Sequence, residues 1–238
     1  MYYILALFSV IFLLVVIQRN FTTDTNSLTF SNTQTMGEIF EKKANSVNKH
    51  HLDIIDNLNL ESVSFPANDS RDTLEELTYL RGLQDTRHLY PNISDNLNSQ
   101  VQRDYCIDAY PISKKEKKAL SRCINKCVDP ICWYIKRHFN RVRPKFLDHR
   151  IQPGVSTPTH PAFPSGHATW NYFIAKAISD KYPEKTNEVY GIADEFATNR
   201  ELGGVHYPSD TEYGYQLAHQ IYNEINDPLH PFHQFVKI

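Results

Sequence analysis

The chain has 238 residues, of which 41% are hydrophobic and 22% charged, with a formal net charge of −2. This length suits one domain with a sizeable core. The balanced charge, without a strongly basic block, argues against a nucleic-acid-binding domain, which carries a basic face. We therefore expect no nucleic-acid partner. Eight glycines are few for an all-β protein, whose turns demand more, so helices are favoured.

The N-terminal segment Met1–Ile17 is almost unbroken apolar sequence and is followed by Gln18 and Arg19. A membrane-spanning helix needs about 20 apolar residues, with a lower limit near 17. A cleaved signal peptide should show a basic start and a small-residue cleavage site, and neither is evident. Residues 1–18 are therefore predicted to be a signal anchor in preference to a signal peptide. The protein is expected to be single-pass in the membrane, or secreted if the segment is cleaved.

A polar segment follows the apolar one. Residues 19–35 are rich in Thr, Ser and Asn and are predicted to be a stalk. Residues 36–238 are then predicted to form a single all-α domain. Glycosylation sequons begin at Asn20, Asn68 and Asn92, which favours a lumenal or extracytoplasmic position for this domain.

The four cysteines lie close together in the sequence, at Cys106, Cys123, Cys127 and Cys132. No histidine is interleaved at zinc-ligand spacing, so we expect no metal site there. An even number of cysteines in an exported domain suggests one or two disulfides. The alternative is four reduced thiols buried as small hydrophobic side chains. The sequence does not determine the pairing.

Apolar residues recur at helical spacing along most of the chain. The expected helices cover residues 36–60, 73–83, 113–126, 129–139, 165–182, 184–200 and 209–225. Capping-box patterns predict three of the helix starts, at Thr73–Glu76, Ser113–Glu116 and Ser209–Glu212. Asp129–Pro130 predicts a fourth start, as an N-cap followed by proline at the first helical position. No strand pattern is evident, so the predicted fold is an all-α helical bundle.

Two short segments carry groups suited to binding an oxyanion. Lys136 and Arg143, separated by six residues and followed by proline, lie two turns apart on one face of a helix. They could together hold a multiply charged anion. The run Pro-Ser-Gly-His at residues 164–167 stands where a loop is expected to enter a helix. Backbone N–H groups at a helix N-terminus bind anions, and the helix dipole favours negative charge there.

A third segment supplies a further cation, a histidine and a carboxylate. Arg200 precedes His206 by six residues, and Asp210 follows His206 by four. The carboxylate is placed to orient the imidazole, as in catalytic triads. Each of the three segments alone is common in proteins. Together, and in this order, they converge on one task, the binding and attack of a phosphate-like oxyanion.

The three segments resemble the motifs of the superfamily that joins type 2 phosphatidic acid phosphatases, bacterial class A nonspecific acid phosphatases and vanadium haloperoxidases. The family pattern is K-x6-R-P, then P-S-G-H, then S-R-x5-H-x3-D. The chain matches it from Lys136 to Asp210, except that Asn199 replaces the serine before Arg200. The resemblance implies the all-α bundle of the acid phosphatase/vanadium haloperoxidase type. With one apolar segment at most, the architecture is most similar to that of the class A acid phosphatases.

The resemblance also implies a role for each motif residue. His206 corresponds to the nucleophile, Asp210 to the group that orients it, and His167 to the general acid and base. The implied phosphate-binding residues are Lys136, Arg143, Ser165, Gly166 and Arg200. Fixed cations would take the place of a metal ion. The expected function is therefore a metal-independent phosphatase that hydrolyses small-molecule or lipid phosphate monoesters through a phosphohistidine, without a cofactor.

Other interpretations share these residues. A vanadium-dependent haloperoxidase would hold vanadate as a cofactor in the same cradle, although such enzymes are typically much larger. A phosphate- or lipid-binding module without catalysis is a third possibility, and a metallophosphatase would lack its usual carboxylate ligands. Four aromatic residues near the motifs are candidates for a specificity pocket or for the core: Phe146, Phe163, Trp170 and Tyr172.

Overall fold

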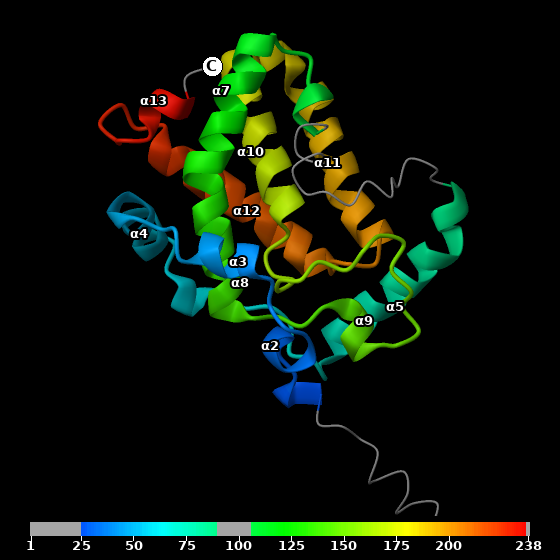
Figure 1. The fold of residues 1–238 in the computed structure, drawn as a ribbon. Coiled ribbons are helices and arrows are strands. Elements are labelled where there is room, and N and C mark those ends of the chain that lie inside the picture. The colour runs from blue at the N-terminus through cyan, green and yellow to red at the C-terminus, as the bar shows by residue number, and fades with distance from the viewer. Residues whose placement is uncertain (1–24, 90–105, 237–238) are drawn as a thin grey trace, which may run out of the picture.

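The computed structural model describes residues 25–89 and 106–236, and these residues form helices and connecting loops without any strand (Figure 1). The predicted all-α fold class is confirmed over these ranges. The predicted anchor at residues 1–18 lies outside them and stays a prediction. Within the described ranges, no helix combines the length and the apolar character needed to cross a bilayer.

The longer helices build the body of the domain. They are α3 (Glu38–Ala44), α4 (Lys49–Asn57), α5 (Arg71–Thr86), α7 (Lys114–Cys123), α8 (Asp129–Phe139), α10 (Gly166–Lys181), α11 (Thr186–Leu202) and α12 (Pro208–Ile225). Short helices and 3-10 turns connect them. These are η1 (Thr25–Ser27), α2 (Phe30–Thr33), η2 (Leu60–Ser62), η3 (Arg87–Leu89), α9 (Pro144–Leu147), η5 (Pro183–Lys185) and α13 (His233–Val236).

Helices α7 and α8 form one continuous rod. The capping box predicted at Ser113 is confirmed, and α8 begins at Asp129 as predicted, with Pro130 in its first turn. Asp129 is not an N-cap, however, because the π-helical turn η4 (Ile124–Val128) leads directly into α8. Pro130 has no N–H to donate to the carbonyl of Lys126, four residues earlier. That carbonyl accepts a hydrogen bond from His51 Nε2 instead, at 2.8 Å. Helix α4, which carries His51, is thus hydrogen-bonded to the rod at the point where Pro130 interrupts its helical hydrogen bonds.

Two predicted helix starts are wrong. Helix α5 begins before Thr73, because Ser70 is its N-cap and accepts a hydrogen bond from the Thr73 amide at 3.1 Å. Helix α12 begins at Pro208, before the predicted cap at Ser209. Proline is favoured at this first helical position because its φ angle is already helical. The Asp210 carboxylate then caps the backbone amide of residue 207, at 3.1 Å.

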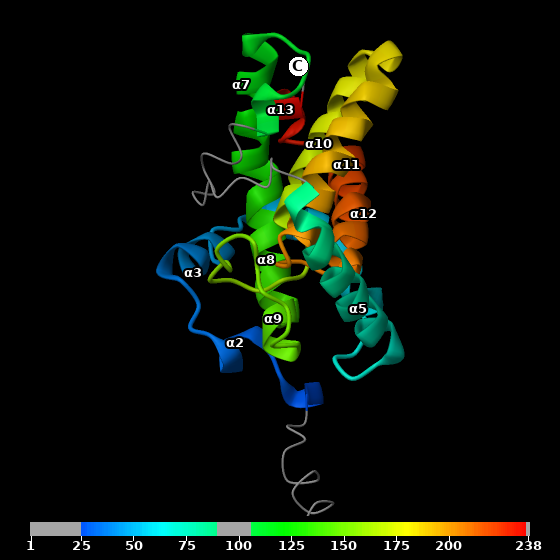
Figure 2. The ribbon, with the colours of Figure 1, turned by 90° about the vertical axis from the view of Figure 1, so that its right-hand side faces the viewer.

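Helix α10 lies between α11 and α12 and packs along both of them, and Figure 2 shows the α7–α8 rod beside this group. The N-termini of α10 and α12 meet, since the Ser165 amide donates to the Asp210 carbonyl at 2.9 Å. Gly214 permits this close approach. A Cβ atom at Gly214 would lie 2.8 Å from the Cβ of Ala168. The second and third motifs are therefore held directly against each other.

The segment before α4 packs on the domain. Phe30 is fully buried, and its amide donates to the Asn140 carbonyl at 2.9 Å. Residues 25–35, predicted as part of a stalk, therefore contact the helical body. Helix α3 continues this contact along α8, where the rings of Phe40 and Trp133 meet edge to face with centroids 5.7 Å apart.

All four cysteines are buried, and none forms a disulfide. This agrees with the alternative of four reduced thiols. Burial raises the pKa of the Cys132 thiol to about 11, which keeps it protonated at neutral pH.

Candidate active site

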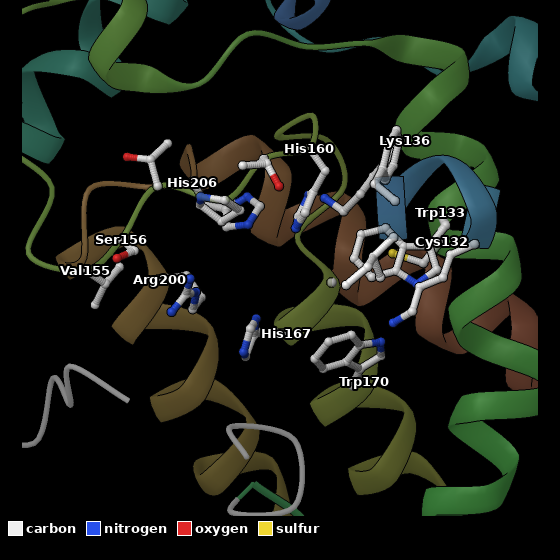
Figure 3. A pocket seen from close by; sticks show the side chains of 17 residues that line it. Cys132, Trp133, Lys136, Val155, Ser156, His160, His167, Trp170, Arg200 and His206 are labelled. Carbon is white, nitrogen blue, oxygen red and sulfur yellow. The ribbon is translucent and has the colours of Figure 1, made fainter. Parts of the chain in front are cut away.

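A cavity of about 310 Å³ opens where α3, α8, α10 and α11 approach one another (Figure 3). All three motifs contribute to its wall. The predicted site residues that line it are Lys136, Gly166, His167, Arg200 and His206. Arg143, Ser165 and Asp210 do not line the cavity, but they contact residues that shape it.

His206 has the geometry of a nucleophile. It is 2% exposed, and its Nδ1 lies 3.0 Å from Asp210 Oδ2. Because an ionised carboxylate can only accept, Nδ1 carries the proton and Nε2 keeps its lone pair. Burial, reinforced by the charge of Arg143, holds the pKa of His206 well below its ordinary value. The ring is therefore neutral at neutral pH, the form that a nucleophile requires.

The Asp210 carboxylate is itself held by a chain of buried charges. Its Oδ1 accepts from Arg141 Nη1 at 2.6 Å, and Arg141 Nη2 donates to Glu76 Oε2 at 3.0 Å. Glu76 Oε1 also accepts from the Ser209 amide at 2.7 Å. Sequence analysis missed both supporting residues. Arg141 stands inside the first motif, which was a signal, whereas Glu76 on α5 was predicted only as part of a capping box, and that pattern did not point to the site.

Lys136 holds the loop that leads into α10. Its ammonium group donates to the carbonyls of Pro161 at 3.1 Å and Ala162 at 2.9 Å, and also to the carbonyl of Pro164. Burial lowers the pKa of Lys136 to about 7. The side chain reaches the cavity, as predicted for a phosphate-binding residue. A direct contact with an oxyanion would require it to release one of these carbonyls.

Arg143 ties the same loop to the nucleophile. Its Nε donates to the His160 carbonyl at 3.0 Å, and its Nη1 donates to the Val205 carbonyl at 2.6 Å and to His206 Nε2 at 3.0 Å. Burial lowers the pKa of Arg143 to about 9, so the group stays charged at neutral pH. Its Nη2 also lies 3.0 Å from Nδ1 of His160. His160 lines the cavity and was not predicted as a site residue.

Arg200 provides the clearest evidence of an anion site. It is 8% exposed, and its Nε is buried without a hydrogen-bond partner in the described part of the chain. Burial lowers the pKa of Arg200 to about 10, so it remains a cation at neutral pH. An unsatisfied buried donor costs about 1–3 kcal/mol, and a bound anion would recover this free energy. The N-terminus of α10, at Gly166, adds its own donors to the same cavity.

Ser165 caps α10. Its Oγ accepts from the Ala168 amide at 3.4 Å, so the hydroxyl is already used as the N-cap, and its role toward phosphate stays a prediction. His167 follows in the first turn and lines the cavity with its ring 4.9 Å from that of Trp170. Trp170, one of the four aromatic residues considered for a specificity pocket or for the core, lines the cavity. The other aromatic candidates do not line the cavity: Phe146, Phe163 and Tyr172.

A family model described as the PAP2 superfamily matches residues 119–220. This segment belongs to the PAP2 superfamily. It contains all three motifs, so the superfamily predicted from them is confirmed. The PAP2 segment also contains α8, α10, α11 and most of α12, which continues to Ile225. Helices α3 and α5, which contribute Phe40 and Glu76 to the site region, precede it.

Two solved structures are similar to the chain. One is a bacterial vanadium-dependent iodoperoxidase, with a TM-score of 0.44 and 18% identity over 68% of this chain and 50% of the iodoperoxidase. The other is a transmembrane PAP2-type phosphatidylglycerolphosphate phosphatase from Bacillus subtilis, with a TM-score of 0.34 and 18% identity over 78% and 89% of the two chains. The chain thus spans half the length of the iodoperoxidase. No curated protein sequence matches it significantly.

Proposed function

We propose that the chain is a phosphatase that hydrolyses phosphate monoesters through a phosphohistidine on His206. The arrangement that carries this proposal is the neutral His206 ring fixed by Asp210. It shares a cavity with Arg200, whose buried Nε lacks a hydrogen-bond partner among the described residues. A nucleophile and an unsatisfied cation in one small cavity suit attack on a phosphoryl group.

The reaction has two steps. His206 Nε2 attacks phosphorus, the bond from phosphorus to the alcohol oxygen breaks, and His167 donates a proton to the departing alkoxide. Asp210 stabilises the positive charge that forms on the His206 ring. His167 then accepts a proton from water as the water oxygen attacks phosphorus. The phosphorus–nitrogen bond breaks, inorganic phosphate leaves, and His206 returns to its neutral form.

Substrate binding must first expose the nucleophile. In the described structure Arg143 Nη1 donates to His206 Nε2, the atom that attacks. A phosphoryl oxygen is a stronger, charged acceptor for that N–H. Arg143 would therefore turn its hydrogen bond from His206 to the substrate, which frees the lone pair and neutralises phosphoryl charge together with Arg200.

Vanadate remains the alternative ligand. It is a tetrahedral oxyanion like phosphate, so the His206 Nε2, Arg200 and the N-terminus of α10 fit it for the same reasons. When bound, vanadate would supply the activation of peroxide that a haloperoxidase needs. The two functions give opposite results with one reagent. A phosphatase is inhibited by vanadate, whereas a haloperoxidase gains bromide or chloride oxidation with peroxide.

The test is hydrolysis of a chromogenic phosphate monoester by the full chain in the presence of a chelator. The described residues contain no group of three or more His, Cys, Asp or Glu side chains that could hold a metal ion, and we expect activity to persist. His206→Ala should abolish it, and His138→Ala, a change at an exposed histidine, should not. Acid-labile phosphate should be trapped on the wild type and on His138→Ala, but not on His206→Ala. Chelator-sensitive hydrolysis, or hydrolysis by His206→Ala, would contradict the proposal.

A further inference from the structure

The cavity extends beyond the catalytic groups to a second wall. This wall consists of Ile39, Phe40 and Lys43 from α3 and Trp133 from α8. Figure 3 shows Trp133 on the far side of the cavity from His206 and Arg200. Helix α3 precedes the segment that matches the PAP2 superfamily. The wall therefore combines a residue of the matched segment with a helix that belongs to this chain's own N-terminal part.

Helix α3 is fixed in place beside the cavity. The Gly37 amide donates to the Thr159 carbonyl at 3.0 Å, and a Cβ atom at Gly37 would lie 2.7 Å from Thr159 Oγ1. At the other end of α3, Arg137 Nη1 donates to Asn45 Oδ1 at 2.5 Å. Both ends of the helix are thus tied to elements of the catalytic segment, and its side chains form a defined surface.

The wall is aromatic. The Phe40 ring lies edge-on to Trp133 and is stacked on His160, with centroids 5.7 Å and 5.9 Å away. Trp133 is 7% exposed, and within the described ranges its indole Nε1 is buried without a hydrogen-bond partner. A flat apolar group would find an aromatic surface here.

The wall also carries positive charge. Lys43 Nζ lies 4.9 Å from the centre of the Trp133 ring, and no ion pair of Lys43 occurs in the described residues. Glu41 on the same helix pairs with Arg137 and not with Lys43, with its Oε2 3.5 Å from Arg137 Nη1. The described residues that line the cavity include three basic side chains, Lys43, Lys136 and Arg200, and no carboxylate. Two of these side chains lie in the motifs, and Lys43 is left for a second anionic group.

We propose that Phe40, Lys43 and Trp133 form a subsite for the leaving group of the substrate. The ligand it fits is a compact phosphate monoester whose alcohol part is planar and bears a second anionic group, a carboxylate or a phosphate. A volume of about 310 Å³ is at the lower end of small-molecule sites, which suits a compact molecule. This inference rests on the proposed function, because it names the substrate class for the same site.

Two non-hydrolysable probes test the subsite without catalysis. Phenylphosphonate and 4-carboxyphenylphosphonate differ only by the second anionic group. Calorimetric titration of the full chain should show the carboxylated probe binding about fivefold more tightly or better, as expected for one additional partly exposed ion pair. Lys43→Gln should bring the ratio of the two Kd values close to one. Lys42→Gln, a change at an exposed lysine on the same helix, should keep the wild-type ratio.

Several outcomes would overturn the subsite. These are equal Kd values for the two probes on the wild type, an unchanged ratio in Lys43→Gln, and a lost ratio in Lys42→Gln. If neither probe binds, both the subsite and the proposed oxyanion site at Arg200 are overturned.

Hydrolysis of phenyl phosphate and 4-carboxyphenyl phosphate separates this inference from the proposed function. If neither ester is hydrolysed but the Kd ratio depends on Lys43, the phosphatase proposal fails and the subsite stands. If both esters are hydrolysed with equal kcat/KM and the Kd values are equal, the subsite fails and the phosphatase stands.

Discussion

The cationic residues of the site differ in how their hydrogen bonds are used. The N–H groups of Lys136 and Arg143 donate to backbone carbonyls, and Arg143 also donates to His206. These hydrogen bonds hold the loop before α10 and the His206 ring in place. Arg200 keeps a buried Nε without a partner among the described residues. These residues share charge and burial, yet only Arg200 has a donor left for an incoming anion. Under the proposed function, the oxyanion site is therefore centred on Arg200 before substrate arrives.

Replacing Arg200 should separate binding from stability. Arg200→Gln removes the buried cation and its unsatisfied Nε, so the thermal midpoint should not fall. The same change removes a charge-assisted contact to phosphate, and the KM for a phosphate monoester should rise at least about tenfold. Thermal unfolding and steady-state kinetics measure the two effects. A large drop in Tm with unchanged KM would show that Arg200 is a structural residue instead.

Residue patterns predicted which side chains come together, but not how each is used. The motif spacing placed Lys136, Arg143 and His206 in one site, and the structure brings them together. The prediction that Lys136 and Arg143 share one helix face is wrong, because α8 ends at Phe139 and Arg143 has an extended backbone. Spacing could not reveal that Arg143 donates to the nucleophile, because that depends on the path of the loop. Lys43 belongs to no motif and Glu76 only to a predicted capping box. Their places at the site follow from the packing of helices distant in sequence.

At the scale of elements, α5 reaches the Asp210 support through the side chain of Glu76. Glu76 binds Arg141, which binds Asp210, so α5 supports the nucleophile without touching the cavity. Helix periodicity predicted this element correctly. Its start was wrong because Ser70 is an equally good cap three residues earlier, and local patterns do not rank two competing caps.

Glu76 is expected to be a positioning residue for His206. Glu76→Gln removes a negative charge near Arg141, so the surroundings of Asp210 become more positive. The kcat should fall about tenfold while KM changes little, by analogy with the loss of an outer supporting group. The acid limb of the pH–rate profile should move to lower pH, because protonated His206 is less stabilised.

The matched control for this prediction lies on the same helix. Glu75→Gln changes an exposed carboxylate that pairs with Arg71, and it should leave both kcat and the pH profile unchanged. Equal kinetics for the two variants would show that the buried chain of charges has no influence on His206. A fall in kcat without a shift of the acid limb would indicate a structural role for Glu76.

The crossing of α10 and α12 sets the distance between the second and third motifs. Gly214→Ala would place a Cβ 2.8 Å from Ala168 Cβ and 3.1 Å from the Ser165 carbonyl. The helices must separate, and we expect a loss of about 1–3 kcal/mol in the free energy of unfolding. Gly191→Ala on α11 is the control, since among the described residues no atom beyond the neighbouring helix backbone lies within 4 Å of a Cβ there. It should be neutral or stabilising by up to about 1 kcal/mol. Denaturant titration compares the two, and equal results would contradict the close packing.

At the scale of the whole molecule, the site makes the fold sensitive to acid. Burial, followed by the charges of Arg143 and Lys136, holds the pKa values of His160 and His206 well below the ordinary range. The unfolded chain binds protons near pH 6.5, whereas these folded histidines do not. Their contribution to stability is therefore present above about pH 6.5 and is lost as the pH falls below it.

Thermal unfolding between about pH 7.5 and 5 measures this sensitivity. The wild type should lose Tm as the pH falls. His160→Asn, which keeps an acceptor for Arg143 but cannot titrate, should lose less. His138→Asn, at an exposed position, should follow the wild type. If His160→Asn and the wild type have the same pH dependence, His160 is not a source of the acid sensitivity.

The molecule divides its site between two parts of the chain. The segment that matches the PAP2 superfamily carries the catalytic motifs, and α3 and α5 supply a cavity wall and a support for Asp210. The all-α fold and the motif residues could be predicted from periodicity and spacing. The contribution of the N-terminal helices could not, because it arises from contacts such as Gly37 with Thr159 that join remote segments.

The chain contains two tryptophans, and both Trp133 and Trp170 line the cavity. All of its indole fluorescence therefore originates beside the site. Trp133 lies next to the ammonium group of Lys43, and Trp170 lies next to the His167 ring. An anion entering at either place changes the electric field on one indole. The unlabelled protein thus carries an optical probe of occupancy, and Trp133→Phe and Trp170→Phe would assign the signal to the wall or to the catalytic end.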